Sequence, residues 1–289
     1  MFNAPIIDDY NGGLVLDFFD SSEYELQDDT NTDALARDYV RMHMLPWKEH
    51  EASCVSVSRR IQKALIYQYD AEFIQAIRKV YYDGLVRVYH QLKAREAAGT
   101  LTPEQNNQAH LYISNCLTAL PFTDPSPYEC FKFPQLVEGT WTLVDYTVHL
   151  IELTEESRAL KDKVFAYGFS PLVERRCPAH FVFAATTYPA GRGFVTQMGA
   201  NMDAFTIPGR SLYESGHMRV GAWCDKQNAI NHVKTHAHGN SQGGALTLQL
   251  AIHQGDKLAK AYALNPPGLF EVAPVNDAFD RWHEEGFNR

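Results

Sequence analysis

A glycine-flanked serine in the C-terminal third of the chain restricts the fold more than any other feature. The string Gly239-Asn240-Ser241-Gln242-Gly243 has the pattern G-x-S-x-G and lies between a strand-like run, 231–238, and a helix-like run, 245–253. Glycine is needed on both sides of the serine because a Cβ atom there would clash with the strand and the helix. Strand, tight turn and helix in this order are the setting of a nucleophile elbow, which exposes a serine hydroxyl above the end of a sheet. The pattern therefore predicts an α/β fold with Ser241 as a nucleophile, facing the positive end of the following helix dipole.

Length and composition indicate a globular protein with an ample core. The chain has 289 residues, of which 45% are hydrophobic and 21% are charged. The formal net charge of -9, with no run of basic residues, argues against a nucleic-acid partner, since phosphate contacts need clustered Lys and Arg. No segment approaches the roughly 18 uninterrupted apolar residues of a membrane span. We therefore expect no stable membrane insertion.

The cysteines and the N-terminal residues bear on the compartment. Five cysteines are widely spaced and none belongs to a C-x-x-C pair, so neither a zinc site nor a disulfide framework is indicated. Residues 1–9 lack the basic and apolar regions of a signal peptide. We expect reduced thiols and a cytoplasmic location; delivery by a specialised secretion system would leave the same pattern.

Residues 1–138 have a helical pattern. The acidic stretch 28–33 predicts the cap of a helix that covers 34–42. Apolar residues spaced three and four apart predict helix between 53 and 99. Thr102 followed by Pro103 predicts the start of a further helix. The proline-rich stretch 121–134 predicts a loop.

From Gly139 onward, strand-like runs alternate with helical ones. The predicted strands cover 141–153, 164–169, 180–185, 231–238 and 259–264, and the predicted helices cover 212–227 and 245–253. Such alternation predicts a mostly parallel sheet with flanking helices. The sequence thus divides into a helical region, 1–138, and an α/β domain, 139–289.

Three strings resemble a known family. The string Gly-Asn-Ser-Gln-Gly-Gly-Ala-Leu around Ser241 resembles the elbow of α/β-hydrolases and, more narrowly, the G-H-S-x-G-G-A-L string of lipase class 3-type enzymes. Residues 183–186 resemble the F-R-G-T string of these lipases, and 263–268 resemble the strand end that follows the elbow helix. The resemblance covers about residues 139–270. It implies a lipase or esterase that hydrolyses lipid or small acyl esters through an acyl-enzyme on Ser241, without a metal or organic cofactor. It also implies an oxyanion hole made by the Gln242 backbone N–H and a group near Thr186.

The chain departs from the family pattern at three places. Asn240 replaces the usual histidine of the elbow, and 184–185 are Ala-Ala where the family has Arg-Gly. In α/β-hydrolases the acid and the histidine follow the serine along the chain, in this fold after two further strands beyond the one ending at Leu264. Only 48 residues follow Ser241, and no strand-like run follows Leu264. We therefore expect the acid and histidine strands to be missing and the domain to be incomplete at its C-terminus.

Two interpretations of the function stay open. If the chain is active, the candidate acid and base are Asp277, Asp280 and His283, of which the last two lie three apart on a predicted helix. If the chain is a truncated or impaired relative, it acts as a binding or interaction module. In either case an incomplete sheet has an open edge, and pairing with a second copy is one way to cover that edge.

The elbow strand also carries histidines. His232, His236 and His238 occupy alternate positions, so their side chains share one face of the strand. An H-x-H pair can bind zinc, yet no Asp, Glu or Cys at ligand spacing accompanies it. The sequence therefore assigns no metal, and whether His236 and His238 bind one stays open.

The glycine-rich connection 190–209 contains Phe194, Met198, Met202 and Phe205. As a mobile loop beside the elbow, these apolar side chains would cover an acyl-chain groove. The alternative is that they fill the core beneath a long loop.

Overall fold

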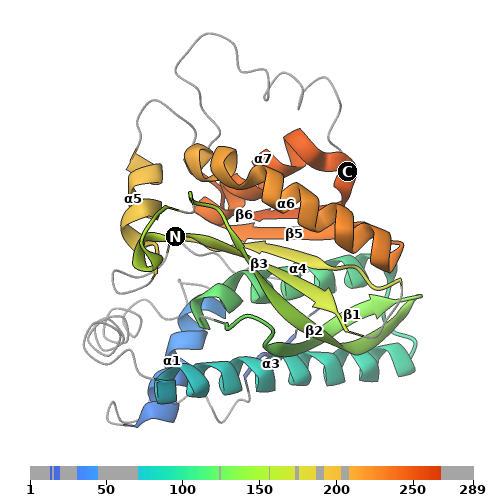
Figure 1. Ribbon diagram of the computed structural model, residues 1–289. Coiled ribbons are helices and arrows are strands. Elements are labelled where there is room, and N and C mark those ends of the chain that lie inside the picture. Colours follow the sequence, from blue (N-terminus) through green and yellow to red (C-terminus); the bar gives the residue numbers. More distant parts are fainter. Residues whose placement is uncertain are drawn as a thin grey trace. The chain divides into compact units, whose positions relative to one another are not determined.

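A computed structural model describes residues 14, 16–19, 31–44, 71–123, 125–155, 157–172, 176–186, 192–202 and 208–267. The chain divides into two compact units. One comprises Met1–Pro125 and Cys130–Tyr146, and the other comprises Ser126–Glu129 and Thr147–Arg289. Six strands form one sheet in the order β1-β2-β3-β4-β5-β6 (Figure 1). In the part of the chain that the structure describes, no helix is both long enough and apolar enough to cross a membrane.

The described part of the first unit contains three α-helices: α1 (Thr32–Met44), α3 (Ala71–Ala97) and α4 (Pro103–Ala119). The predicted three- and four-residue spacing is confirmed on α3, whose buried side chains are Phe73, Ile77, Tyr81, Leu85, Val88 and Leu92. The predicted start of α4 is also confirmed. The Thr102 hydroxyl accepts a hydrogen bond from the Gln105 N–H, and the Gln105 side chain accepts one from the Thr102 N–H. The predicted helical stretch 53–70 lies outside the described residues.

A hairpin of β1 (Cys130–Val137) and β2 (Thr140–Glu152) follows these helices. Glu138 and Gly139 form its turn, with φ of 48° and 82°, as a two-residue hairpin loop with both residues at positive φ requires. The prediction of a loop through 121–134 is wrong for the start of β1. Pro134 made the segment look like a loop, but β1 is an edge strand, where a missing N–H is tolerated.

Trp141 fastens the hairpin to the helices of the first unit. Its backbone N–H donates to Glu96 Oε1 at 2.8 Å, and its indole Nε1–H donates to Asn106 Oδ1 at 2.9 Å. The side chain is almost fully buried, and its two donors are thus satisfied by α3 and α4.

The remaining strands show that the sheet is mixed. Strand β3 (Phe165–Pro171) pairs antiparallel with β4 (His180–Phe183), whereas β4, β5 (Thr235–Asn240) and β6 (Leu258–Leu264) are parallel. The α/β class is confirmed, but the prediction of a mostly parallel sheet is wrong. Parallel neighbours need a crossover of a dozen or more residues, and the connection between β3 and β4, 172–179, is shorter than that, which favours antiparallel pairing. In the part of the chain that the structure describes, α-helices between neighbouring strands of β2–β6 occur in the connections to β5 and β6 alone.

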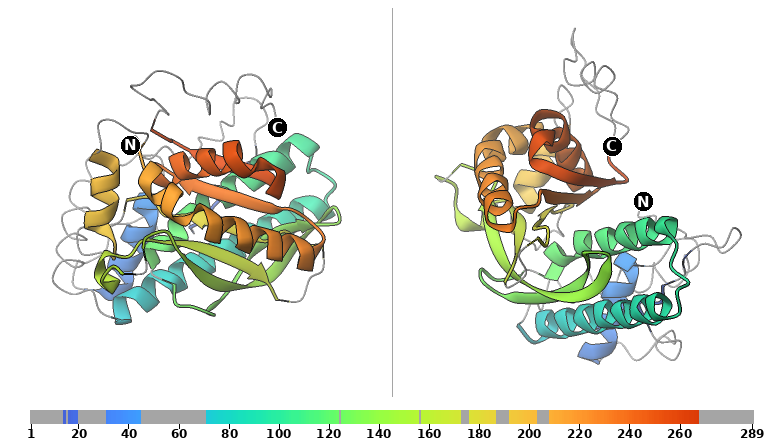
Figure 2. Two further views of the ribbon diagram at one scale, coloured as in Figure 1. Left: turned by 45° about the horizontal axis from the view of Figure 1, so that its top comes forward. Right: turned by 90° about the vertical axis from the view of Figure 1, so that its right-hand side faces the viewer.

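Helices α6 (Arg210–Asn231) and α7 (Gln242–Gln254) cover one face of strands β4–β6 (Figures 1 and 2). The core between this face and the helices contains buried side chains from β4, β5, α6 and α7: Phe181, Phe183, Ala237, Val220, Cys224, Leu246 and Leu250. Side chains alternate along a strand, so the immediate neighbours of Phe181, Phe183 and Ala237 in each strand point to the opposite face of the sheet. The histidines of β4 and β5 are among them.

Candidate active site

Ser241 lies in the sharp turn between β5 and α7, as the sequence predicts. Its φ of 53° and ψ of -122° place a non-glycine residue in a region that side chains rarely occupy. The Ser241 N–H donates to the Leu264 carbonyl at the end of β6, at 2.9 Å, and the Ser241 carbonyl accepts from the Ala245 N–H at 3.1 Å. The strained residue is therefore held by the neighbouring strand on one side and by the first turn of α7 on the other.

Close backbone approach explains the glycines of the elbow. A Cβ atom at Gly239 would lie 2.0 Å from the Gly243 carbonyl oxygen, and one at Gly243 would lie 2.4 Å from the Phe183 carbonyl oxygen. Both distances are far shorter than van der Waals contact. The expectation that any side chain here would collide with the strand and the helix is confirmed.

The structure brings together Gln242 and Thr186, the two residues assigned to the oxyanion hole. Gln242 is the first residue of α7, so its backbone N–H belongs to the group of helix-terminal donors without an intrahelical acceptor. The Thr186 hydroxyl, just beyond β4, donates to Gln242 Oε1 at 3.5 Å and accepts from Asn201 Nδ2 at 2.8 Å. Asn201 was missed in the sequence, because nothing in the spacing links residue 201 to residue 186.

A short helix, α5 (Phe194–Met202), lies in the connection that was predicted to be a glycine-rich loop. Two amide side chains bind it to the elbow region. The Gln242 Nε2 donates to the Gln197 carbonyl at 3.1 Å, and the Gln197 Nε2 donates to the Ala185 carbonyl at 3.3 Å. Helix α5 thus contacts both the start of α7 and the segment after β4.

The apolar side chains of this connection fall into different environments. Met202 is 76% exposed, while Phe194 and Met198 are half-buried. Phe205 lies outside the described residues. That these side chains cover an acyl-chain groove stays a prediction. The half-buried positions of Phe194 and Met198 agree in part with the alternative, that the side chains fill the core.

The candidate triad partners of Ser241 lie outside the described residues. Within that part of the chain, the Ser241 hydroxyl has no histidine or carboxylate as a hydrogen-bond partner. Asp277, Asp280 and His283, the candidates from the sequence, lie outside it. At the carboxyl end of β6, Asn265 adopts a φ of 44° and donates from Nδ2 to Asn240 Oδ1 at 3.4 Å.

A groove of about 620 Å³ lies between α6 and α7 and is separate from the elbow. Tyr213 and His217 of α6 and His253 and Gln254 of α7 are among its lining residues, and Ser241 is not. Burial raises the pKa of the Tyr213 hydroxyl, which accepts a hydrogen bond from Gln254 Nε2 at 3.3 Å. This groove is therefore not the site at which the elbow would act.

The histidines of the elbow strand do not all share one environment. His236 and His238 lie on the same face of β5, as predicted, whereas His232 precedes the strand and is exposed. His180 of β4, which the sequence did not point to, joins the first two.

Comparison with protein-family models, curated proteins and solved structures finds no match to this chain.

Proposed function

We propose that this chain is a serine hydrolase of lipase or esterase type, which hydrolyses acyl esters through an acyl-enzyme on Ser241. The observation that carries the proposal is the backbone of Ser241, with φ 53° and ψ -122° between a parallel strand and a helix N-terminus. A structure keeps a strained non-glycine residue only where its surroundings enforce it, and such residues cluster at active sites. Here the enforcing contacts are the hydrogen bond to β6 and the close packing at Gly239 and Gly243.

Besides the nucleophile, the reaction needs a base, a donor that stabilises the oxyanion, and a water molecule. The Ser241 oxygen attacks the ester carbonyl carbon while a base takes the hydroxyl proton, and the alcohol leaves with that proton. The developing oxyanion would be stabilised by the Gln242 N–H at the positive end of α7. The Thr186 hydroxyl already donates to the Gln242 side chain. We therefore assign Thr186 to holding the segment after β4 beside the start of α7. Water then attacks the acyl-enzyme and releases the acid.

None of the described histidines bonds the Ser241 hydroxyl, and we assign the base to a residue outside the described part of the chain. His283 is the candidate base, and Asp277 and Asp280 are the candidate acids. Replacement of a triad histidine lowers kcat by a factor of about 10⁴ or more. We expect His283→Gln to lower ester hydrolysis to that extent if this histidine is the base.

A fluorophosphonate probe tests the proposal directly, because it reacts with a serine only when that serine is activated. We expect labelling of Ser241, located by peptide mass spectrometry, and its loss in Ser241→Ala. Ser211→Ala is the matched control, since Ser211 is an exposed serine at the start of α6. The proposal fails if the folded wild-type chain is not labelled, or if Ser241→Ala is labelled as strongly as wild type.

The second candidate is a binding module that keeps a hydrolase-like elbow without catalysis. It is favoured by one observation, the lack of a histidine or carboxylate partner for the Ser241 hydroxyl among the described residues. This candidate predicts a folded chain that the probe does not label and that has no ester hydrolysis above that of Ser241→Ala.

A further inference from the structure

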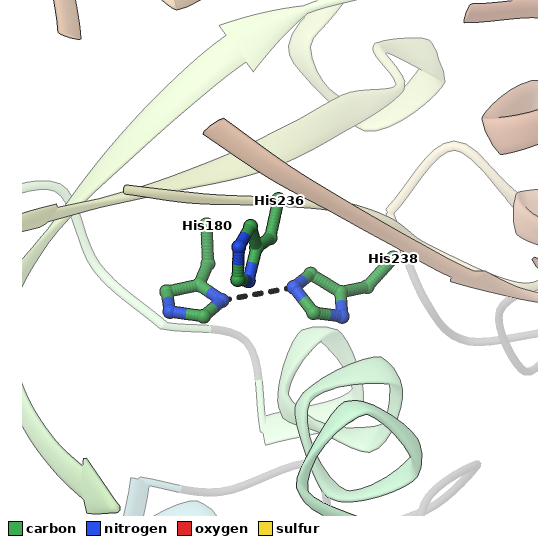
Figure 3. A group of neighbouring side chains, drawn as sticks. All are labelled: His180, His236 and His238. Atoms are coloured by element: carbon green, nitrogen blue, oxygen red, sulfur yellow. Dashed lines mark hydrogen bonds between the residues drawn. The ribbon is translucent and has the colours of Figure 1, made fainter. Parts of the chain in front are cut away.

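Three histidines from two neighbouring strands converge on one face of the sheet (Figure 3). His180 of β4 is the register partner of His236 of β5, and His238 follows two residues later on the same face. His180 Nδ1 and His238 Nε2 are 2.9 Å apart and form a hydrogen bond, while the rings of His180 and His236 meet edge-on at 5.3 Å. One nitrogen from each ring lies within 4.8 Å of the other two.

The three rings of the cluster are buried. The exposed fractions of His180, His236 and His238 are 2%, 8% and 2%. Neutral imidazole is the ligand form for divalent transition metals, and the metal competes with a proton for the same lone pair.

The separations between the ring nitrogens differ from those of a tetrahedral zinc site by about 1.5 Å or less. Zinc–nitrogen bonds of about 2.0–2.1 Å at tetrahedral angles place the ligand nitrogens roughly 3.3 Å apart. The His180–His238 pair at 2.9 Å would open by a few tenths of an ångström, and pairs at up to 4.8 Å would close by about 1.5 Å. Side-chain rotation alone can supply shifts of this size, without a change in strand register.

We propose that His180, His236 and His238 form a site for one zinc ion. Imidazole nitrogen suits Zn²⁺ among the common divalent ions, and three histidines leave a fourth position for water or another oxygen donor. The ion would replace the His180–His238 hydrogen bond with two metal bonds and would link β4 to β5. By linking the two strands, the ion would hold β5, the strand that leads into Ser241, from the face that α7 does not cover.

Tyr262 of β6 supplies an independent observation beside the cluster. Its ring stacks on that of His238 at 5.2 Å with an interplanar angle of 10°. Its hydroxyl is buried, and in the described part of the chain it has no hydrogen-bond partner. A buried hydroxyl without a partner is destabilising, and a zinc-bound water would give it one.

The first experiment uses the full-length chain and the metal alone. After expression with zinc and extensive dialysis, we expect about one zinc per chain by elemental mass spectrometry. Replacement by Co²⁺ should give the visible d–d absorption of a tetrahedral site, and added Zn²⁺ should remove that absorption. A folded wild-type chain that retains no zinc and gives no such absorption with Co²⁺ overturns the proposal.

Variants then locate the ion. Loss of a group that merely orients a metal ligand lowers affinity by about 10- to 100-fold, so loss of a ligand itself should cost at least about 100-fold. We expect this loss in His180→Gln and His238→Gln, and no change in His253→Gln, whose histidine is exposed on α7. Equal zinc affinity in His238→Gln and His253→Gln contradicts the assignment.

A third measurement separates metal loss from misfolding. Zinc at 100 times its dissociation constant should stabilise wild type by about 2.7 kcal/mol, visible as a rise in the thermal midpoint. His238→Gln should melt cooperatively near the metal-free wild type and show no rise with zinc. If His238→Gln does not fold, His236→Asn replaces it in the same assay. A rise in the variants equal to that of wild type overturns the proposal, whatever the result at Ser241.

Discussion

A methyl group added at Gly239 has no room between β5 and α7. The new Cβ atom would lie 2.0 Å from the Gly243 carbonyl oxygen and 2.5 Å from Thr247 Oγ1. Ordinary contact begins at about 3.4 Å. The strand and the start of the helix would therefore have to separate by about 1.4 Å, in a region where Leu246 and Leu250 are fully buried.

The expected cost of Gly239→Ala is about 3 kcal/mol or more, the upper end of the range for overpacking, because the atom in the way is backbone. For a domain of this size, that corresponds to a fall in thermal midpoint of about 6–12 °C. Thr247→Ala added to Gly239→Ala should not restore stability. It removes the hydroxyl at 2.5 Å but leaves the carbonyl at 2.0 Å.

Gly199→Ala is the matched control for this substitution. Gly199 is exposed within α5, and a Cβ atom there would have no neighbour within 4 Å. Alanine inside a helix is more favourable than glycine by about 0.5–1 kcal/mol, so the midpoint should stay level or rise by a few degrees. The change is read from thermal and urea unfolding followed by circular dichroism. If Gly239→Ala melts as Gly199→Ala does, the close packing of the elbow is refuted.

Two further predictions concern titratable groups of the second unit and the exposed thiol of β1. Burial, with a smaller effect of Lys226, lowers the pKa of His149 from 6.5. The unfolded chain therefore binds a proton at His149 more readily than the folded chain does. The free energy of unfolding is thus unaffected by this group above pH 6.5 and decreases as the pH falls through 6.5 toward the folded pKa. Urea midpoints at pH 7 and about 5 should thus converge in His149→Gln relative to wild type, and equal pH dependence of the two proteins would contradict this. Burial raises the pKa of Cys224 to about 12, whereas Cys130 is exposed, so a maleimide should label Cys130 in the folded chain and Cys224 only in denaturant, as peptide mass spectrometry can resolve; equal labelling rates would refute the burial of Cys224.

Local signals made much of the fold predictable. The capped start of α4, the buried spacing of α3 and the strand–turn–helix at Ser241 each depend on residues close together in the chain. Strand β1 was missed because Pro134 disfavours a central strand, and the sequence does not show that β1 lies at an edge. The direction of β3 was missed because it depends on the length of a connection rather than on side-chain pattern.

The candidate sites follow the same division. Ser241 and Gln242 were predictable, because the elbow is a local motif. His180 was not, because it lies on β4 and meets His238 only through strand register, 58 residues apart in the chain. Alternation along β5 gave two of the three histidines, and the third depends on long-range pairing that spacing along one strand cannot reveal.

The order of the strands in the sheet is also their order in the chain, which affects how the protein is made. Each strand after β1 pairs with the one synthesised immediately before it, so the sheet can grow at one edge as the chain leaves the ribosome, without a later strand inserting between two earlier ones. The slowest addition should be β5, since α5 and α6 separate it from β4 and the loop to be closed is long. Until then β4 is the growing edge, and its four-residue length, His180–Phe183, limits the backbone it offers to a wrong partner.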